Sequence, residues 1–306
     1  MKVYEYYRFF FRRQIQKLSY RKIGKAYLGD IVSIARDYIL YKHIDVFAGA
    51  MAYSFFLALF PTLIFLLALL PYIPIDNFQN LAINWIKEFL PGDAFSLVYR
   101  TVKELFEKRT FGFFSLNFLA IVFFATRGVN TMVQAINEID QSDEPLSFFK
   151  KQINSLIIFA TIFFLGFLGV IAFITGEVVL KILFTTFRIL RAVEYYLLSL
   201  LNWGVEFFII LLAVSIIYNW APKAKKTFRL FSVGAVIAAF LMLFAQFGLK
   251  QYFLNFSSYN KLYGSLGAVI TLMVWFYFMS LALLVGFVLN QSIKQATFKN
   301  KAQNIT

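Results

Sequence analysis

The chain has 306 residues, of which 60% are hydrophobic and 20% aromatic, and its formal net charge is +14. Because soluble domains are typically about 45–50% apolar, this composition, with a mean hydropathy of +0.69, excludes an ordinary soluble globular protein. The chain contains no cysteine and one histidine, which excludes disulfides, thiolate catalysis and a metal site built from several cysteines or histidines.

Six apolar stretches divide the chain, at residues 46–70, 111–132, 154–180, 195–220, 230–249 and 264–289. An α-helix rises about 1.5 Å per residue, so roughly 20 apolar residues cross the hydrocarbon core of a membrane. In lipid each segment has to satisfy its own backbone hydrogen bonds, and these runs lack the alternation of a membrane β-barrel. The sequence therefore predicts an all-α polytopic membrane protein with six transmembrane helices.

Three parts are expected along the chain. Residues 1–45 mix tyrosine and phenylalanine with arginine and lysine, which is typical of interfacial helices at the level of the lipid head groups. Residues 46–290 form the transmembrane domain, and residues 291–306 form a basic tail. Within the transmembrane domain, residues 71–110 contain two amphipathic helical segments. We expect no secretory signal peptide and no separate soluble domain.

The basic residues predict the orientation of the spans. They concentrate in the N-terminal tail, in the loop at residues 223–229 and in the C-terminal tail, which all fall on one side of a six-span protein. The positive-inside rule places that side, with both termini, in the cytoplasm. The partners that we expect are membrane lipids, anionic lipids in particular, and not nucleic acid. Whether it forms a homo-oligomer or binds envelope proteins stays open.

The first span is expected to pack closely and to bend. Ala48, Gly49, Ala50 and Ala52 form a patch of small residues that lets another helix approach. Pro61 removes a backbone hydrogen bond and should kink the helix.

Polar residues inside the spans are the candidate functional residues, because an ionisable group there costs several kcal/mol unless it is paired or hydrated. They are expected to face a lipid- or anion-facing cavity built from the second, fourth and sixth spans. Arg127 offers a planar fork of donors that suits a phosphate or a carboxylate; a structural ion pair or a snorkelling arginine explains it equally well. The candidates are Arg127, Asn130, Glu177, Glu206 and Gln246.

Four carboxylates follow the second span, on a segment that we expect to be a flexible polar loop. They are Glu138, Asp140, Asp143 and Glu144. Without a histidine or a second cluster nearby they do not indicate a metal site. The favoured interpretation is a solvated acidic surface or a partner of nearby lysines.

Four short motifs occur in consistent order along residues 30–295. The first runs from Ala52 and Tyr53 to Pro61, the second contains Arg127, Gly128 and Asn130, and the third is Tyr218-Asn219-Trp220-Ala221-Pro222. The fourth is Ser258-Tyr259-Asn260-Lys261-Leu262-Tyr263-Gly264-Ser265-Leu266-Gly267. Together they resemble the YihY/virulence factor BrkB family of bacterial inner-membrane proteins, once described as ribonuclease BN. The resemblance implies a multi-pass protein of the bacterial inner (plasma) membrane, with six transmembrane helices and cytoplasmic termini, and it brings no settled activity.

The fourth motif has two interpretations. Gly264 and Gly267 let the chain re-enter the membrane tightly, and backbone N–H groups at the helix start suit an anion. Alternatively, Ser258 or Asn260 caps the helix or braces the turn. Tyr259, Asn260 and Tyr263 are candidate residues at the mouth of a cavity in either case.

Two functions are in keeping with these features. The first is a transporter or a lipid or anion translocator of the cell envelope, a process to which the resemblance links some family members. The second is a non-transporting scaffold for envelope assembly, in which the polar residues of the spans pair with one another. Ribonuclease activity is not expected, because phosphodiester hydrolysis usually needs clustered metal ligands or an acid–base pair. We expect no enzyme activity, no cofactor and no bound metal.

Overall fold

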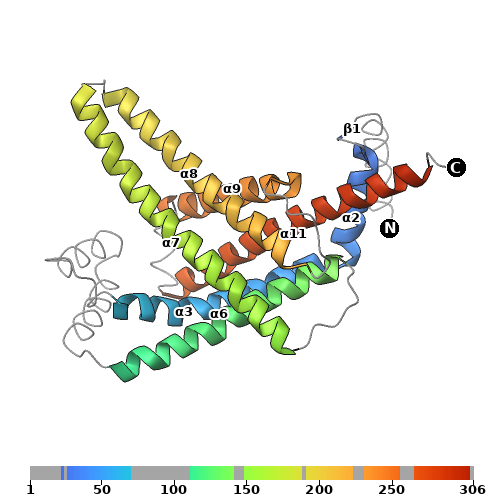
Figure 1. Cartoon of the computed structure of the whole chain (residues 1–306), viewed down its shortest axis with the longest axis horizontal. Coiled ribbons are helices and arrows are strands. Elements are labelled where there is room, and N and C mark those ends of the chain that lie inside the picture. The colour runs from blue at the N-terminus through green and yellow to red at the C-terminus, as the bar shows by residue number, and fades with distance from the viewer. Residues whose placement is uncertain are drawn as a thin grey trace. The chain divides into compact units, whose positions relative to one another are not determined.

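In the residues that the computed structural model describes, the regular elements are helices and one short hairpin (Figure 1). It describes residues 22–23, 26–69, 111–140, 148–187, 191–222, 231–255 and 265–303. The elements are β1 (Lys22–Ile23), β2 (Ala26–Tyr27), α2 (Leu28–Tyr41), α3 (Ile44–Leu69), α6 (Phe111–Asp140), α7 (Phe148–Phe187), α8 (Arg191–Trp220), α9 (Val233–Asn255) and α11 (Ser265–Gln303).

Four helices in the described part of the chain are long and apolar enough to cross a membrane. The qualifying segments are Ile44–Thr62 of α3, Lys151–Gly169 of α7, Trp203–Trp220 of α8 and Val269–Asn300 of α11. A shorter apolar helix covers Val233–Leu249 of α9. The predicted helical class is confirmed, whereas the count of six spans and their orientation stay predictions.

The helix α6 continues further than the sequence pattern indicated. The prediction of a flexible loop after the second span is wrong for Glu138 and Asp140, because α6 extends to Asp140. Ile136 and Ile139 are fully buried there and hold this last turn of α6 in place. Glu138 forms an ion pair of 3.3 Å with Lys42, as expected for a partner of nearby lysines. Asp143 and Glu144 lie outside the described residues.

Residues 291–303 of the expected basic tail form the C-terminal part of α11, which ends at Gln303. Its apolar residues Ile293 and Ala296 pack against Ile31 and Ile34 of α2. This contact gives residues 291–303 a reason to stay helical, because helices in proteins are stabilised mainly by packing of an apolar face.

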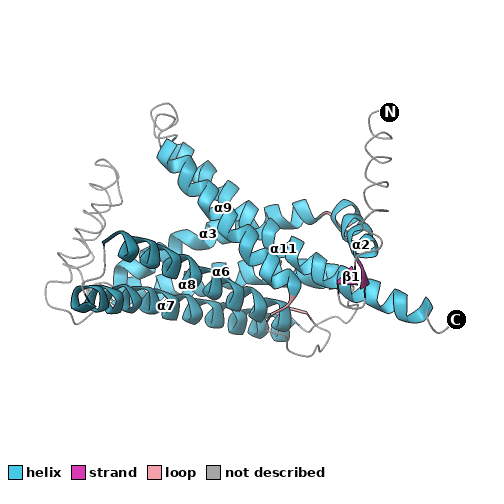
Figure 2. Ribbon diagram, turned by 90° about the horizontal axis from the view of Figure 1, so that it is seen from above, coloured by secondary structure: helices cyan, strands magenta, loops and turns pink. Residues whose placement is uncertain are grey.

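The segment before the first span is only partly helical. An antiparallel hairpin pairs Lys22 with Tyr27 and Ile23 with Ala26, and α2 starts directly after it. The strand β2 contacts both α2 and α11 (Figure 2). The sequence predicted interfacial helices over residues 1–45 and did not indicate these strands. Residues 1–21 lie outside the described part.

The chain divides into two compact units, Met1–Ala52 with Val129–Thr306, and Tyr53–Gly128. In the larger unit α7 contacts α8, α8 contacts α9, and α9 contacts α11. Along its C-terminal part α11 also contacts α2, as both views show (Figures 1 and 2). In the smaller unit a Cβ at Gly128 would lie 2.9 Å from the ring of Phe55, so this glycine allows close packing.

Two glycines bring α9 and α11 into backbone contact. A Cβ added at Gly234 would lie 2.0 Å from the carbonyl oxygen of Gly286, and one added at Gly286 would lie 2.4 Å from that of Gly234. No larger residue fits at either position without moving a backbone. The neighbouring Ala235 and Ala238 are fully buried, so small residues define this crossing.

Polar contacts join α2 to the C-terminal part of α11. The Gln295 amide donates a hydrogen bond of 2.6 Å to the Tyr38 hydroxyl, and Lys299 forms an ion pair of 3.1 Å with Asp30. Burial raises the pKa of Tyr38 above its usual value of 10.0, the Gln295 hydrogen bond opposes this, and the charge of Asp140 raises it further. These contacts fix α2 against the C-terminal part of α11.

Candidate functional site

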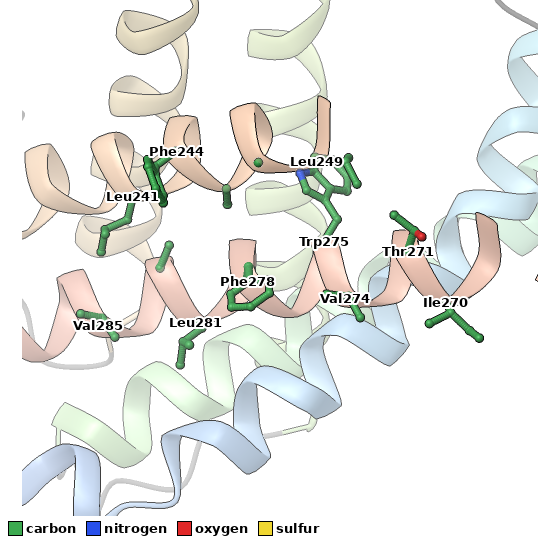
Figure 3. A pocket seen from close by; sticks show the side chains of 13 residues that line it. Leu241, Phe244, Leu249, Ile270, Thr271, Val274, Trp275, Phe278, Leu281 and Val285 are labelled. Carbon is green, nitrogen blue, oxygen red and sulfur yellow. The ribbon is translucent and has the colours of Figure 1, made fainter. Parts of the chain in front are cut away.

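A groove of about 640 Å³ lies between α9 and α11, within the larger unit (Figure 3). Leu241, Phe244 and Gly248 of α9 form one wall, and Trp275 and Phe278 of α11 form part of the other. The volume lies in the range of about 300–1,000 Å³ that is usual for small-molecule sites. Its lining is almost entirely apolar and contains no charged residue.

The spacing of the lining residues along α9 and α11 creates this groove. The lining positions of α9 are 241, 244, 245, 248 and 249, a spacing that places them on one helix face. The groove begins where the glycine contact ends, because Leu241 follows Ala238 by one turn and Val285 directly precedes Gly286. Small residues therefore join the two helices at one end, and larger side chains line the space beside them.

The groove runs along the helices and is open to the side. On α11 its lining extends from Ile270 to Val285, which corresponds to about 22 Å along the helix axis. Phe244 and Phe278 line it and are 74% and 51% exposed. Exposed aromatic side chains on an apolar span are typical of a surface that faces hydrocarbon. The groove therefore runs along the apolar segment Val269–Asn300, which is long enough to cross a membrane.

Trp275 is the polar feature of the groove wall that has no partner. Its indole nitrogen Nε1 is buried and has no hydrogen-bond acceptor within the described structure. Figure 3 shows this nitrogen turned toward α9, close to Leu249. A buried donor without an acceptor costs about 1–3 kcal/mol, and this one lies within the packing of α11 against α9 and is not exposed to the groove.

Glu206 and Gln246 are two predicted site residues that the structure brings together. The Gln246 amide nitrogen Nε2 donates to the carboxylate oxygen Oε1 of Glu206, across α8 and α9. Two ring contacts flank the pair: Trp203 with Phe247, whose centroids are 6.5 Å apart, and Phe207 with Phe240, at 4.7 Å. The pair lies on the side of α9 that faces α8, and it does not line the groove.

Asn130 is held between α6 and α7. Its Nδ2 donates a hydrogen bond of 2.8 Å to Gln152, and its Oδ1 accepts one of 2.5 Å from the fully buried Ser155. Both of these hydrogen bonds of the Asn130 amide therefore join α6 to α7. Arg127 belongs to the smaller unit, and its side chain is exposed.

The motif residues divide into described and undescribed positions. Ala52 and Pro222 are buried, Tyr53 is 56% exposed, and Pro61 lies within α3. Ser265 begins α11, which also contains Gly267. Tyr259, Asn260, Tyr263 and Gly264 lie outside the described residues, as do the side chains of Glu177 and Ser265.

The sequence analysis missed an amide that links α11 to the start of α9. Asn290 donates from Nδ2 to the Ser232 hydroxyl and accepts at Oδ1 from the backbone N–H of Gly234, both at 2.8 Å. The Ser232 hydroxyl also accepts from the N–H of Ala235 at 3.2 Å, as a helix N-cap does. A serine directly before an apolar helix is a sequence signal for a helix N-cap, so the role of Ser232 could have been predicted. Its partner Asn290 could not, because it lies far away in the sequence.

The sequence analysis placed a cavity among the second, fourth and sixth spans, and this location stays a prediction. The groove described above lies elsewhere, between α9 and α11, the helices of the predicted fifth and sixth spans. None of Arg127, Asn130, Glu206 and Gln246 lines it. Among the residues that the structure describes, no group of three or more histidine, aspartate or glutamate side chains is placed to hold a metal ion.

Apolar helices long enough to span a bilayer, with a side-open apolar groove between two of them, define the chain as a multi-pass helical membrane protein. The sequence model of the family described as Virulence factor BrkB matches residues 37–305. The chain therefore belongs to this family, and the resemblance seen in its motifs is confirmed.

Individual relatives agree with this assignment. A UPF0761 membrane protein of Psychromonas ingrahamii is 25% identical over 297 residues, covering 93% of this chain and 97% of the relative. A UPF0761 membrane protein of Vibrio vulnificus is 28% identical over 252 residues, or 80% of this chain and 76% of the relative. The ribonuclease-like protein YfkH of Bacillus subtilis is 28% identical over 241 residues, or 78% and 86%. No solved structure matches the chain.

Proposed function

We propose that the protein binds membrane lipid in the α9–α11 groove and moves it within the cell-envelope membrane, as a lipid translocator. The observation that carries this proposal is the groove itself: it is apolar, about 640 Å³ in volume and aligned with the helices. An aqueous solute or a free anion needs polar or charged groups along its path, and the lining contains no charged residue. Hydrocarbon is the ligand chemistry that matches such a surface.

We further propose the bacterial inner membrane as its location, with both termini in the cytoplasm, on the basis of the positive-inside rule. The ribonuclease-like name of YfkH belongs to that relative. The described residues offer no cluster of metal ligands that would favour extending it to this chain.

A scaffold is the second candidate, and the polar pairs support it. Gln246 bonds Glu206, and Asn130 bonds Gln152 and Ser155. Polar residues that satisfy one another between helices are what a non-transporting bundle requires. Under this alternative the groove holds lipid as a passive part of the structure.

Filling the groove distinguishes the two functions. A Cβ added at Gly248, on the groove wall, meets no atom within 4 Å, so Gly248→Leu places a side chain in the groove without a backbone clash. Gly166 of α7 also has open space around it and does not line the groove. Gly166→Leu is therefore the matched control, with the same gain in helix propensity.

The experiment is transbilayer movement of fluorescent phospholipid in vesicles that contain the purified protein. We expect the wild type and Gly166→Leu to accelerate it, and Gly248→Leu to lose most of the acceleration. Equal rates for the wild type and Gly248→Leu, or a wild type no faster than protein-free vesicles, would favour the scaffold.

A further inference from the structure

The depth of the groove in a membrane follows from the length of α9. The apolar segment of this helix is Val233–Leu249, which is about 25 Å long and so nearly matches the hydrocarbon core of roughly 30 Å. A segment of this length has little freedom to shift along the membrane normal, because a shift would expose apolar side chains at one end. Its middle residue, Leu241, therefore lies near the centre of the bilayer.

The two halves of this segment contact α11 in different ways. In the N-terminal half the helices touch: a Cβ added at Gly286 would lie 2.4 Å from the Gly234 carbonyl oxygen and 2.7 Å from the Ala238 Cβ. The groove lining on α9 begins at Leu241 and ends at Leu249, so the groove is confined to the C-terminal half. The glycine contact therefore closes the groove near the centre of the bilayer.

The length of the groove on α11 agrees with this depth. In Figure 3, Leu241 and Val285 lie at one end of the groove, and Leu249 and Ile270 lie at the other. From Val285 to Ile270 the α11 wall extends about 22 Å. Half of a bilayer measures about 15 Å in hydrocarbon and about 20–22 Å with its head groups. A groove that starts at the centre thus reaches the head groups of one leaflet, which is the extent of one phospholipid.

The other half of α11 provides a check on this placement. With Val285 at the centre, Gln295 lies about 15 Å and Lys299 about 21 Å further along the helix, at the hydrocarbon boundary and the head-group level of the opposite leaflet. These two side chains bond Tyr38 and Asp30 of α2. The ion pair between α2 and α11 is thereby placed where head groups and water are available and a charge costs little.

We propose that the groove is a binding site for a phospholipid of one leaflet only, the leaflet at the C-terminal end of α9. The head group lies near Ile270, and one acyl chain ends at Leu241 and Val285. With the cytoplasmic termini proposed above, this is the outer leaflet. The inference rests on the proposed lipid-binding function and names the lipid population that the groove takes: lipid of the outer leaflet enters it, and lipid of the inner leaflet does not reach it.

The test maps how a lipid lies in the groove. Two phosphatidylglycerol probes carry a photoreactive diazirine on one acyl chain, either next to the ester or at the methyl end. Each probe is bound to the purified full-length protein in mild detergent, where no bilayer orients the lipid, and peptide mass spectrometry identifies the residues labelled on irradiation. We expect the methyl-end probe to label residues around Leu241 and Val285, and the ester-end probe to label residues around Leu249 and Ile270.

Variants separate failure of this inference from failure of the lipid site. Gly248→Leu, which fills the groove, should lose most of the label from both probes, whereas Gly166→Leu should be labelled like the wild type. The reverse pattern in the wild type, or equal labelling of both ends by each probe, overturns the inference and leaves lipid binding intact. If Gly248→Leu keeps the labels of the wild type, the proposed lipid site itself fails.

Discussion

Single residues decide where the helices of the larger unit meet. Gly234 and Gly286 are in backbone contact, and Asn290 bonds both the Ser232 hydroxyl and the Gly234 N–H. The Tyr218 hydroxyl donates a hydrogen bond of 2.5 Å to the carbonyl of Leu283, on the same part of α11. Small residues and satisfied amides thus allow the close approach of the two helices at this crossing, as is common between membrane helices.

The glycine contact predicts a strong effect from one methyl group. Gly234→Ala places a Cβ 2.0 Å from the Gly286 carbonyl oxygen, so α9 and α11 have to move apart. We expect the free energy of unfolding to fall by roughly 1–3 kcal/mol or more. Thermal unfolding in detergent measures it. Gly204→Ala, whose Cβ has open space, is the control and should stabilise slightly through helix propensity. Equal melting temperatures of Gly234→Ala and Gly204→Ala would show that the contact between Gly234 and Gly286 is not tight.

Tyr38 predicts an alkaline loss of stability. Its pKa is raised in the folded protein, chiefly by burial, while the unfolded chain ionises near pH 10. Above that pH the unfolded state releases a proton that the folded state retains, so stability falls as the pH rises toward the folded pKa. At pH 8 the Tyr38→Phe variant should be less stable than the wild type, because the hydrogen bond from Gln295 is lost. Above pH 10 its stability should decline less than that of the wild type. Parallel pH profiles of the two proteins would argue against a buried tyrosine.

At the scale of elements, the α8–α9 contact and the α9–α11 groove lie on different faces of α9. Gln246 bonds Glu206 on the first, whereas Gly248 lines the second. The sequence marked Glu206 and Gln246 as functional because polar groups inside spans are costly. The structure shows that each satisfies the other.

Separate faces predict separate effects. Glu206→Leu leaves the Gln246 amide without this acceptor, and we expect it to cost about 1–3 kcal/mol of stability. Lipid movement per folded molecule should stay near the wild-type rate, because the groove is unchanged. Melting curves and the vesicle assay, normalised to folded protein, check both statements. A stable variant with no lipid movement would instead make Glu206 part of the transport path.

At the scale of the whole molecule, composition and hydropathy predicted the class correctly, because long apolar runs have few solutions in a membrane. Helix ends were less predictable. Whether α11 stops at Asn290 or continues to Gln303 depends on the contact of Ala296 with Ile31 of α2, far away in sequence. The groove was not predictable either, since it requires knowing that α9 packs on α11 and where the glycine contact lies.

Orientation is a whole-molecule prediction that the cysteine-free sequence makes easy to test. Lys294 and Gln251 are exposed, near the C-terminal part of α11 and the C-terminal end of α9. Cytoplasmic termini predict that Lys294→Cys reacts with a membrane-impermeant maleimide only after the cells are opened, while Gln251→Cys reacts in intact cells. The reverse labelling pattern would invert the topology.

Occupancy of the α9–α11 groove by lipid is tested most directly by counting the lipids that stay bound to the purified protein. Native mass spectrometry of the wild type, Gly248→Leu and Gly166→Leu, purified from the same membranes, provides the count. The account predicts one lipid fewer on Gly248→Leu than on the other two proteins. The same number of retained lipids on all three would contradict it, because the groove would then hold no lipid that the leucine side chain displaces.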